Sequence, residues 1–351
     1  MWSLKNAIKE MSVAEYARYL RIQSIIRRII SITLITLLTL FVAIFIVIMP
    51  ISGFIYRTEK GATYVHNNPH INYNDRVLVS AHRAGGDLAP EETLKAFKLC
   101  VESPEYKVDV LEFDLHITKD GELVLLHDDT ADRTSNVREV YGANIPVSKL
   151  TLKELKSLNF GEKFVAPDGS KPYKGLRGSD IPNDVKILTL TEILDYLTVQ
   201  SPELNFIIEI KDGGDNGKRA MDKLYQKMVE YDIVERTIIG TFEGEITEYL
   251  DERYPQITRS ASIVEVLGFY YDFLFDAKKD GYSFDVLQIP TGGNLLFNLR
   301  TSAFIDYAHS YDIAVQYWTI NNAKEVARLA RLGADAIMTD DPQMAYEVVN
   351  D

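Results

Sequence analysis

The stretch VDVLEFDLHI, residues 108–117, has the composition of a buried β-strand and carries two acidic side chains on one face. Glu112 and Asp114 are two positions apart, and side chains alternate between the two faces of a strand, so both carboxylates point the same way. A buried charge is costly unless it is paired or binds a metal ion. The stretch therefore predicts a core strand with one chemically active face.

Seven more stretches of similar composition accompany it along the chain. They are RVLVSAH (76–82), NFIIEIK (205–211), TIIGTF (237–242), TRSAS (258–262), FDVLQIP (284–290), IAVQYWTI (313–320) and DAIMTD (335–340). Helical patterns such as NAKEVARLARLG (322–333) separate them, and strands that alternate with helices form parallel sheets. A closed barrel and an open doubly wound sheet both fit this alternation. The count of eight and the polar strand ends favour an α/β fold, a (β/α)8 or TIM barrel over residues 76–351.

One region interrupts the alternation after the second strand. Residues 119–188 hold a short strand pattern (GELVLLHDD, 121–129), a helix pattern (LTLKELKSLNF, 150–160) and a loop rich in Gly and Pro (166–184). Long connections of this kind are usually functional or disordered. We expect a small insertion that lies over the open end of the barrel.

The N-terminal part of the chain contains a long apolar segment. Residues 29–56 include no charged side chain, and about 20 apolar residues suffice to cross a bilayer as a helix. A cleaved signal peptide has a shorter apolar region and a small-residue cleavage site, whereas this run is long and bulky. We therefore predict one transmembrane helix at 29–56, with Pro50 and Gly53 marking its outer end.

Charge sets the expected orientation of this helix. Residues 1–28 carry six Lys or Arg and two Glu, whereas Arg57 and Lys60 follow the apolar segment. The positive-inside rule then places residues 1–28 in the cytoplasm and the barrel domain outside the cell, as a single-pass protein of the cell membrane. Residues 57–75 read as a polar tether, in which we expect the two histidines to be solvated rather than ligands.

The rest of the chain is strongly acidic. The formal net charge is −13, and because residues 1–28 carry a net +4, the remainder carries −17. Such a surface disfavours nucleic acid as a partner, since binding requires basic groups that displace counterions. It does not exclude a phosphate substrate, because a bound cation reverses the local field.

Polar residues gather at the expected carboxyl ends of the strands, where the active sites of such barrels lie. Three more strand ends carry charged or titratable pairs: His82-Arg83, His127-Asp128 and Glu209-x-Lys211. Each pair alone would more often be structural, for example as an internal ion pair. Together with Glu112 and Asp114 they bring three carboxylates, two histidines and two cations to one barrel mouth. This combination predicts an oxygen-ligated divalent cation beside groups that suit proton transfer and an anionic substrate.

Several blocks of the sequence resemble those of the glycerophosphodiester phosphodiesterase family. AHRAGGDLAPEETLKAF (81–97) resembles its opening motif, His-Arg-Gly followed by Pro-Glu-Asn-Thr, and VLEFDLHITKDGELVLLHDDTADRTSN (110–136) is similar to its second block. Later blocks are matched by LTLTEIL (188–194), NFIIEIK (205–211), VQYWTIN (315–321) and GADAIMTDDP (333–342). The resemblance covers residues 78–342 in the family's order.

The resemblance implies a role for each matching residue. His82 and His127 match the two catalytic histidines, and the ligands of one Ca2+ or Mg2+ ion match Glu112, Asp114 and Glu209. Substrate-binding groups match Arg83, Lys211 and Trp318, while Glu91 is a further ligand or lies just behind the ligands. Two positions depart from the pattern: Glu92 replaces the usual Asn, and Ala84 the usual Gly. Glu92 adds a negative charge where a neutral amide is usual, which bears on metal affinity and substrate contact.

The implied reaction is the metal-dependent hydrolysis of a glycerophosphodiester to an alcohol and glycerol phosphate, with one histidine as base and the other as acid. Substrates open to a tethered domain outside the cell are glycerophosphodiesters, lysophospholipids and glycerol-phosphate polymers. Two alternatives remain. One is a phospholipase C- or D-like enzyme that cleaves lipid or lysolipid headgroups. The other is a barrel without activity that binds glycerol-phosphate polymers, against which the intact set of His and acidic residues argues.

Overall fold

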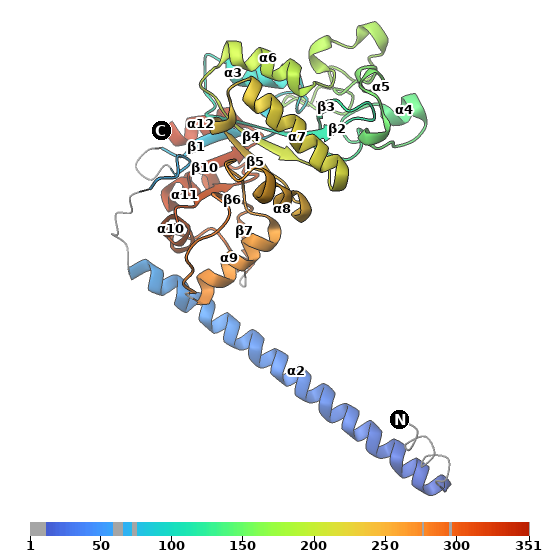
Figure 1. The fold of residues 1–351 in the computed structure, drawn as a ribbon, viewed down its shortest axis with the longest axis vertical. Helices are drawn as coiled ribbons and strands as arrows, with labels where there is room; N and C mark the ends of the chain where they lie inside the picture. The colour runs from blue at the N-terminus through green and yellow to red at the C-terminus, as the bar shows by residue number, and fades with distance from the viewer. Residues whose placement is uncertain (1–11, 59–65, 72–75, 276, 295–296, 351) are drawn as a thin grey trace.

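A computed structural model describes the whole chain except residues 1–11, 59–65, 72–75, 276, 295–296 and 351. Figure 1 shows a long helix, α2, that leads to a rounded domain at its far end. The domain alternates strands with helices from β1 to α12, as the sequence predicts. Its strands form one curled sheet in the order β5-β4-β2-β1-β10-β9-β6, and neighbouring strands in this order are parallel.

The seven strands of this order are short and almost wholly buried. They are β1 (Leu78–Ala81), β2 (Val110–Ile117), β4 (Asn205–Ile210), β5 (Thr237–Gly240), β6 (Val286–Ile289), β9 (Ala314–Tyr317) and β10 (Ala336–Thr339). The predicted strand at 258–262 contributes two single bridges, because Arg259 pairs with β5 and Ser260 with β6, both in parallel. These bridges join the two edges of the sheet. The fold is therefore a TIM barrel, closed by residues 259–260 in the place of the eighth strand.

Eight helices follow the eight strand positions and cover the outside of the barrel. They are α3 (Leu94–Glu102), α6 (Leu190–Gln200), α7 (Gly214–Glu230), α8 (Gly244–Arg253), α9 (Ile263–Phe275), α10 (Ser302–Ser310), α11 (Ala323–Leu332) and α12 (Pro342–Asn350). A short hairpin of β7 (Gly292–Asn294) and β8 (Phe297–Asn298), which the sequence analysis did not predict, lies between β6 and α10.

The alternation of side chains along β2 separates the core from the site. Leu111, Phe113 and Leu115 are fully buried in the cluster between the strands and the helices. Val110 belongs instead to the cluster inside the barrel, which also takes residues from β4, β5, β6, β9 and β10. Burying a Leu or Phe side chain contributes about 1.5–3 kcal/mol, so the outward face fixes the register of β2. Glu112 and Asp114 consequently share the inward face with Val110.

The insertion at 119–188 is an ordered unit beside β2. Its strand β3 (Leu123–Leu125) pairs antiparallel with β2, and two short helices follow, α4 (Val137–Tyr141) and α5 (Leu152–Lys156). It has a small apolar core of its own that includes Val124, Val147 and Leu155. Single 3-10 turns connect these parts at Val147–Lys149, Gly178–Asp180 and Asn183–Val185. The strand β3 leads directly to His127, so the insertion supplies part of the barrel mouth.

Helix α2 (Val13–Thr58) is longer than the predicted span at both ends. Pro50 and Gly53 lie inside the helix rather than at its end, because a proline in a long apolar helix need not break it. Over Ala17–Ile44 the helix is long and apolar enough to cross a membrane. Of the segment predicted to be cytoplasmic, residues 1–28, the first eleven lie outside the described residues.

Part of the predicted tether lies against the barrel instead of extending through solvent. Asn68 donates from Nδ2 to the backbone carbonyls of Asp285 and Asp312 at 2.8 and 2.9 Å. The His66 side chain is only 12% exposed and lies 3.4 Å from the Asp312 carboxylate, and His70 is half-buried. The expectation that both histidines are solvated is therefore wrong for this segment, whereas residues 59–65 and 72–75 of the tether lie outside the described residues.

Candidate active site

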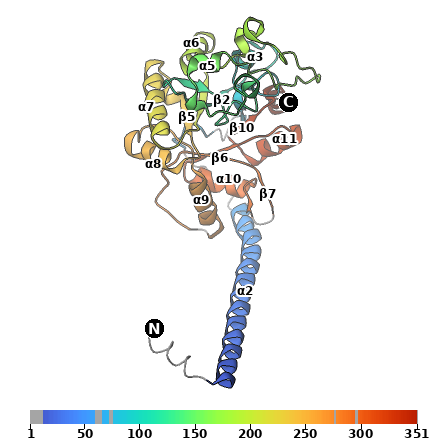
Figure 2. The ribbon, with the colours of Figure 1, turned by 90° about the vertical axis from the view of Figure 1, so that its right-hand side faces the viewer.

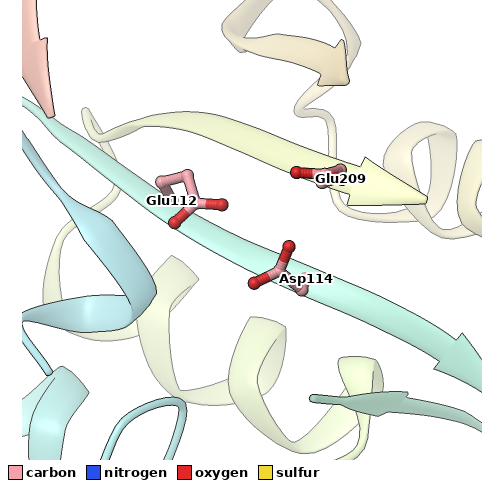
Figure 3. Close-up of side chains that lie close together, drawn as sticks. All are labelled: Glu112, Asp114 and Glu209. Atoms are coloured by element: carbon pink, nitrogen blue, oxygen red, sulfur yellow. The ribbon is translucent and has the colours of Figure 1, made fainter. Parts of the chain in front are cut away.

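Three acidic side chains meet inside the carboxyl end of the barrel (Figure 3). Glu112 and Asp114 come from β2, and Glu209 comes from the adjacent β4, where it is the register partner of Asp114. One oxygen atom from each carboxylate lies within 4.8 Å of the other two. The structure thus brings together the three residues that the sequence predicts as metal ligands.

Asp114 is the carboxylate with the fewest partners. Its side chain is 1% exposed, and neither oxygen atom has a hydrogen-bond partner among the residues that the structure describes. The Arg83 Nε atom lies 3.7 Å and the Lys211 Nζ atom 3.6 Å from it, both beyond normal hydrogen-bond distance. A buried carboxylate in this state is costly, so the arrangement leaves a place for a further positive charge.

The other two carboxylates respond to the same crowding. Burial, followed by the charge of Asp114, raises the pKa of both Glu112 and Glu209 well above the usual range of a glutamate. Three carboxylates crowded together offer only oxygen ligands, which are those that Ca2+ and Mg2+ prefer. The residues present therefore fit a hard divalent cation, which would relieve the repulsion among them.

His82 directly follows β1, and its ring forms a hydrogen bond with the carboxylate of Asp340 near the C-terminal end of the domain. Its Nδ1 atom lies 2.6 Å from the Asp340 Oδ1 atom, just after β10. Asn321 in turn donates from Nδ2 to Asp340 Oδ2 at 2.6 Å. Burial lowers the pKa of His82, but the Asp340 hydrogen bond and the charge of Glu112 outweigh burial, and the pKa is raised. The pocket thus favours the charged form of His82.

His127 follows β3 in the insertion and has the opposite tendency. Its Nδ1 atom lies 2.7 Å from the carboxylate of the adjacent Asp128. Burial lowers its pKa, and the charges of Asp114 and Asp128 only partly compensate for this effect. The neutral imidazole is therefore favoured at His127. Two histidines with pKa values displaced in opposite directions can serve as an acid and a base at the same pH.

Arg133 links the His127 side of the site to Glu91. It donates from Nη1 and Nη2 to the two oxygens of Glu91 at 2.6 and 2.7 Å, and from Nε to Asp128 at 2.8 Å. Arg83 lies 3.3 Å from the same Glu91 carboxylate. Both oxygens of Glu91 are thus engaged by arginines.

Glu92 occupies the position where the family motif has Asn. Its φ angle is 55°, in the left-handed region that Asn adopts more readily than Glu. The side chain is 2% exposed, and its Oε1 atom accepts a hydrogen bond from the backbone N–H of Asp114 at 2.6 Å. Burial, followed by the charges of Asp114 and Glu91, raises the pKa of Glu92 well above its usual range. The pocket thus favours a neutral acid here rather than the additional charge that the sequence suggests.

A cavity at the barrel mouth joins these groups. Its lining includes His82, Arg83, Glu112, His127, Glu209, Thr241, Phe242 and Trp318. Phe242 and Trp318 meet edge to face with ring centroids 6.1 Å apart, and the Lys211 Nζ atom lies 5.5 Å from the Phe242 centroid. The cavity therefore has a charged end at the carboxylates and an aromatic wall beside it.

Three further residues of this site were not assigned by sequence reasoning. Asp340 and Asn321 orient His82, and Arg133 orients Asp128 and Glu91. Asp340 does follow a predicted strand, so the strand-end rule could have found it. Asn321 and Arg133 lie outside the predicted strands, and their partners Asp340 and Glu91 are 19 and 42 positions away in the sequence.

Comparison with known proteins identifies the family of the chain. The model of the glycerophosphoryl diester phosphodiesterase family matches residues 82–344. The chain belongs to this family. All the candidate site residues named above lie within the matched region, and the fold and the enzyme class, a phosphoric diester hydrolase, follow from this membership.

The similarity to individual members of the family extends over most of the length of each member. A glycerophosphodiester phosphodiesterase of Caldanaerobacter subterraneus subsp. tengcongensis is 28% identical over 274 residues, covering 78% of this chain and 98% of that protein. A lysophospholipase D of Rattus norvegicus is 25% identical over 300 residues, or 77% of this chain and 85% of that protein. The structure of an Oleispira antarctica phosphodiesterase in complex with its product sn-glycerol-3-phosphate has a TM-score of 0.57 at 21% identity, covering 79% and 98%.

Proposed function

We propose that this phosphodiesterase uses one divalent cation, Ca2+ or Mg2+, to hydrolyse glycerophosphodiesters to an alcohol and glycerol phosphate at the outer surface of the cell membrane. The observation that carries the proposal is the buried Asp114 carboxylate, which lacks a hydrogen-bond partner among the described residues and lies between two other carboxylates. A protein gains nothing in stability from such a cluster unless a cation completes it.

Glu112, Asp114 and Glu209 would hold the cation, which when bound supplies positive charge at the phosphate. The chain's own cations add to this charge. Arg83 lies 3.7 Å from one oxygen atom of Asp114, and Lys211 lies 3.6 Å from the other. Burial opposes the charge on Lys211, yet Asp114 and Glu209 outweigh it and raise its pKa, so the side chain stays charged and can bind an anionic group.

The two histidines would transfer the protons. His127, favoured in its neutral form, would remove the proton of the attacking hydroxyl group. His82, favoured in its charged form and held by Asp340, would protonate the departing alkoxide of the alcohol. The protonation states required at the start of the reaction are those that the surroundings of each imidazole favour, so no rearrangement has to precede the chemistry.

The aromatic wall of Trp318 and Phe242 suits the part of the substrate that differs among family members. Phe242 is 48% exposed, so it can contact a group that projects out of the cavity. A glycerophosphodiester, a lysophospholipid and a glycerol-phosphate polymer all present a glycerol phosphate with an additional group attached. The similarity to a protein named as a lysophospholipase D favours lysophospholipid as the second candidate substrate.

The location rests on α2. We infer that α2 crosses the cell membrane once, with residues 1–28 in the cytoplasm and the barrel outside, because basic residues are concentrated before its apolar part. Treating intact cells with protease tests this topology. The barrel should be digested while an N-terminal epitope tag survives, and protection of the barrel would contradict the orientation.

A product-resolved assay tests the chemistry. Purified full-length protein, first stripped with EDTA, is given Ca2+ or Mg2+ together with glycerophosphocholine, a lysophospholipid or a glycerol-phosphate polymer. We expect glycerol phosphate and choline from glycerophosphocholine, an acylated glycerol phosphate and the headgroup alcohol from the lysophospholipid, and glycerol phosphate from the polymer. Release of phosphocholine from glycerophosphocholine would support the phospholipase C-like alternative. Binding of a polymer without turnover under any of these conditions would support the inactive barrel.

A further inference from the structure

Helix α9 (Ile263–Phe275) has one face that is both apolar and exposed. Five large side chains on this face are between 42% and 78% exposed: Ile263, Val264, Leu267, Tyr271 and Phe275. Their spacing puts them on a single side of the helix, together with the exposed Gly268. Among the described residues, each of the other helices around the barrel exposes at most one large apolar side chain. A contiguous patch of this kind marks an interaction surface.

The acidic residues of α9 are turned away from this face and neutralised. Glu265 accepts hydrogen bonds from Arg259 at 2.8 and 3.0 Å and forms a capping box with Ser262 at the start of the helix. Asp272 is buried and paired with the Lys279 ammonium group at 2.5 Å. The exposed face therefore carries no charge, although the domain as a whole is acidic.

The position of α9 indicates what covers this face. Helices α9 and α10 lie beside the end of α2 that is remote from the N-terminus, as Figures 1 and 2 show from two directions. The uncharged segment of α2, residues 29–56, is about 42 Å long as a helix, and a bilayer with both headgroup layers is about 40–45 Å thick. Helix α2 ends at Thr58, two residues beyond this segment. If α2 crosses the membrane, α9 lies at the level of the headgroups.

We propose that the exposed face of α9 inserts into the boundary between headgroups and acyl chains of the same bilayer that α2 crosses. This inference rests on the membrane anchor proposed above, but not on the reaction. A helix that is apolar on one side and carries aromatic side chains is suited to this boundary. Ile263 follows the cavity residue Ala261 by two positions, so the docked helix holds the barrel mouth next to the membrane surface.

Site-directed spin labelling of the full-length chain tests the docking without any substrate. Cys100 is the sole cysteine, and because burial raises the pKa of its thiol to about 12, it should not react with a label. Labels are placed by Leu267→Cys on α9, by Ile35→Cys on α2 as the lipid reference, and by Val199→Cys on α6 as the water reference. Val199 is 75% exposed and lies on a helix far from α2 in both views.

Each labelled protein is incorporated at one chain per nanodisc of equimolar phosphatidylcholine and phosphatidylglycerol. The accessibility of the label to oxygen and to a water-soluble nickel chelate is then measured. We expect the Leu267→Cys label to favour oxygen over the chelate several-fold more than the Val199→Cys label does. Equal chelate access at both positions would overturn the docking, and so would protection at Leu267→Cys that appears only with two chains per disc, because a second copy would then cover the face. A water-accessible Ile35→Cys label would instead overturn the anchor.

Discussion

Asp114 and Glu209 face each other as register partners on β2 and β4, and their carboxylates lie together inside the barrel. Like charges on neighbouring strands destabilise a sheet, and here Asp114 is fully buried and Glu209 is largely buried. Lys211 compensates only one of them well, since its Nζ atom is 2.8 Å from Glu209 and 3.6 Å from Asp114. The pair is therefore a source of strain in the free protein and a source of affinity for a cation.

Replacing Asp114 by Asn separates the repulsion within the cluster from the affinity for a cation. The Asp114→Asn substitution keeps the shape of the side chain but removes one charge from the cluster. We expect the affinity for Ca2+ or Mg2+, measured by isothermal titration calorimetry, to fall at least about 100-fold. In EDTA the variant should melt at a higher temperature than the wild-type protein, because the repulsion is relieved.

Asp109 provides a matched control, because it lies just before β2 and away from the site. Asp109 precedes β2 and pairs with Arg76 at 2.6 Å on the far side of the barrel. Asp109→Asn should lower the melting temperature but leave the metal affinity unchanged. An unchanged metal affinity in Asp114→Asn would contradict the proposed ligand set.

The pH dependence of hydrolysis should be bell-shaped, with limbs on either side of pH 6.5. Activity requires neutral His127, whose pKa is lowered, so activity is lost as the pH falls through a value below 6.5. It also requires charged His82, whose pKa is raised, so activity is lost as the pH rises through a value above 6.5. His82→Ala and His127→Ala should each lower kcat by about 10²- to 10⁴-fold. His66→Ala, on the opposite side of the barrel, should have no effect on kcat, and equal losses in all three variants would refute the assignment.

Asp340 should set the upper limb of this profile. In Asp340→Asn the hydrogen bond that raises the His82 pKa is weakened, so the upper limb moves to lower pH and the bell narrows. NMR titration of the His82 ring should report the same decrease in pKa.

The charge-assisted hydrogen bond between His82 and Asp340 contributes about 1.5–3 kcal/mol to stability. Because the folded-state pKa of His82 is the higher one, the stability linked to its charged form is fully present below pH 6.5 and is lost as the pH rises through the folded pKa. A pH-independent loss of stability would mean that Asp340 acts only through packing.

Arg133 should act on catalysis by positioning Asp128 and Glu91. Arg133→Met removes both ion pairs, and we expect kcat/KM to fall by about 10- to 100-fold, as for other residues that orient active-site groups. Arg138→Met is the matched control, because Arg138 is 63% exposed and pairs with Asp132 at the surface. The lower limb of the pH profile should shift only in Arg133→Met, since Asp128 contacts His127. Similar kinetics for the two variants would show that Arg133 has no positioning role.

Local patterns were sufficient to predict most of the fold. The alternation of Leu111, Glu112, Phe113 and Asp114 predicted a strand with a buried face and an acidic face, and β2 has both. Of the eight predicted strands, the stretch 258–262 pairs least in the structure, through Arg259 and Ser260 alone. The predicted helix at 29–56 ends within two residues of the end of α2, but Pro50 and Gly53 lie inside α2 because a proline in a long apolar helix need not break it.

The sequence predicts the site residues that lie on strands or just after them. It does not predict the contacts that form only when the barrel closes. Glu209 and the two histidines lie at or just after strand ends, and Glu112 and Asp114 lie on the inward face of β2, so the fold brings all five to one barrel mouth. The pairing of His82 with Asp340 joins residues 258 positions apart, and it exists only because β1 and β10 are neighbours. The neutral state favoured for Glu92 likewise depends on burial, which the sequence motif does not reveal.

The central claim is that hydrolysis requires a cation held by the three carboxylates. The most direct test is to titrate Ca2+ and Mg2+ into EDTA-treated full-length protein while measuring the release of glycerol phosphate from glycerophosphocholine, with Asp114→Asn assayed in parallel. We predict that the wild-type rate rises from background to a plateau with at least one of the two cations, and that the variant stays at background over the same range. Full activity of the wild-type protein in EDTA, or a wild-type response to the cation in Asp114→Asn, would contradict this account.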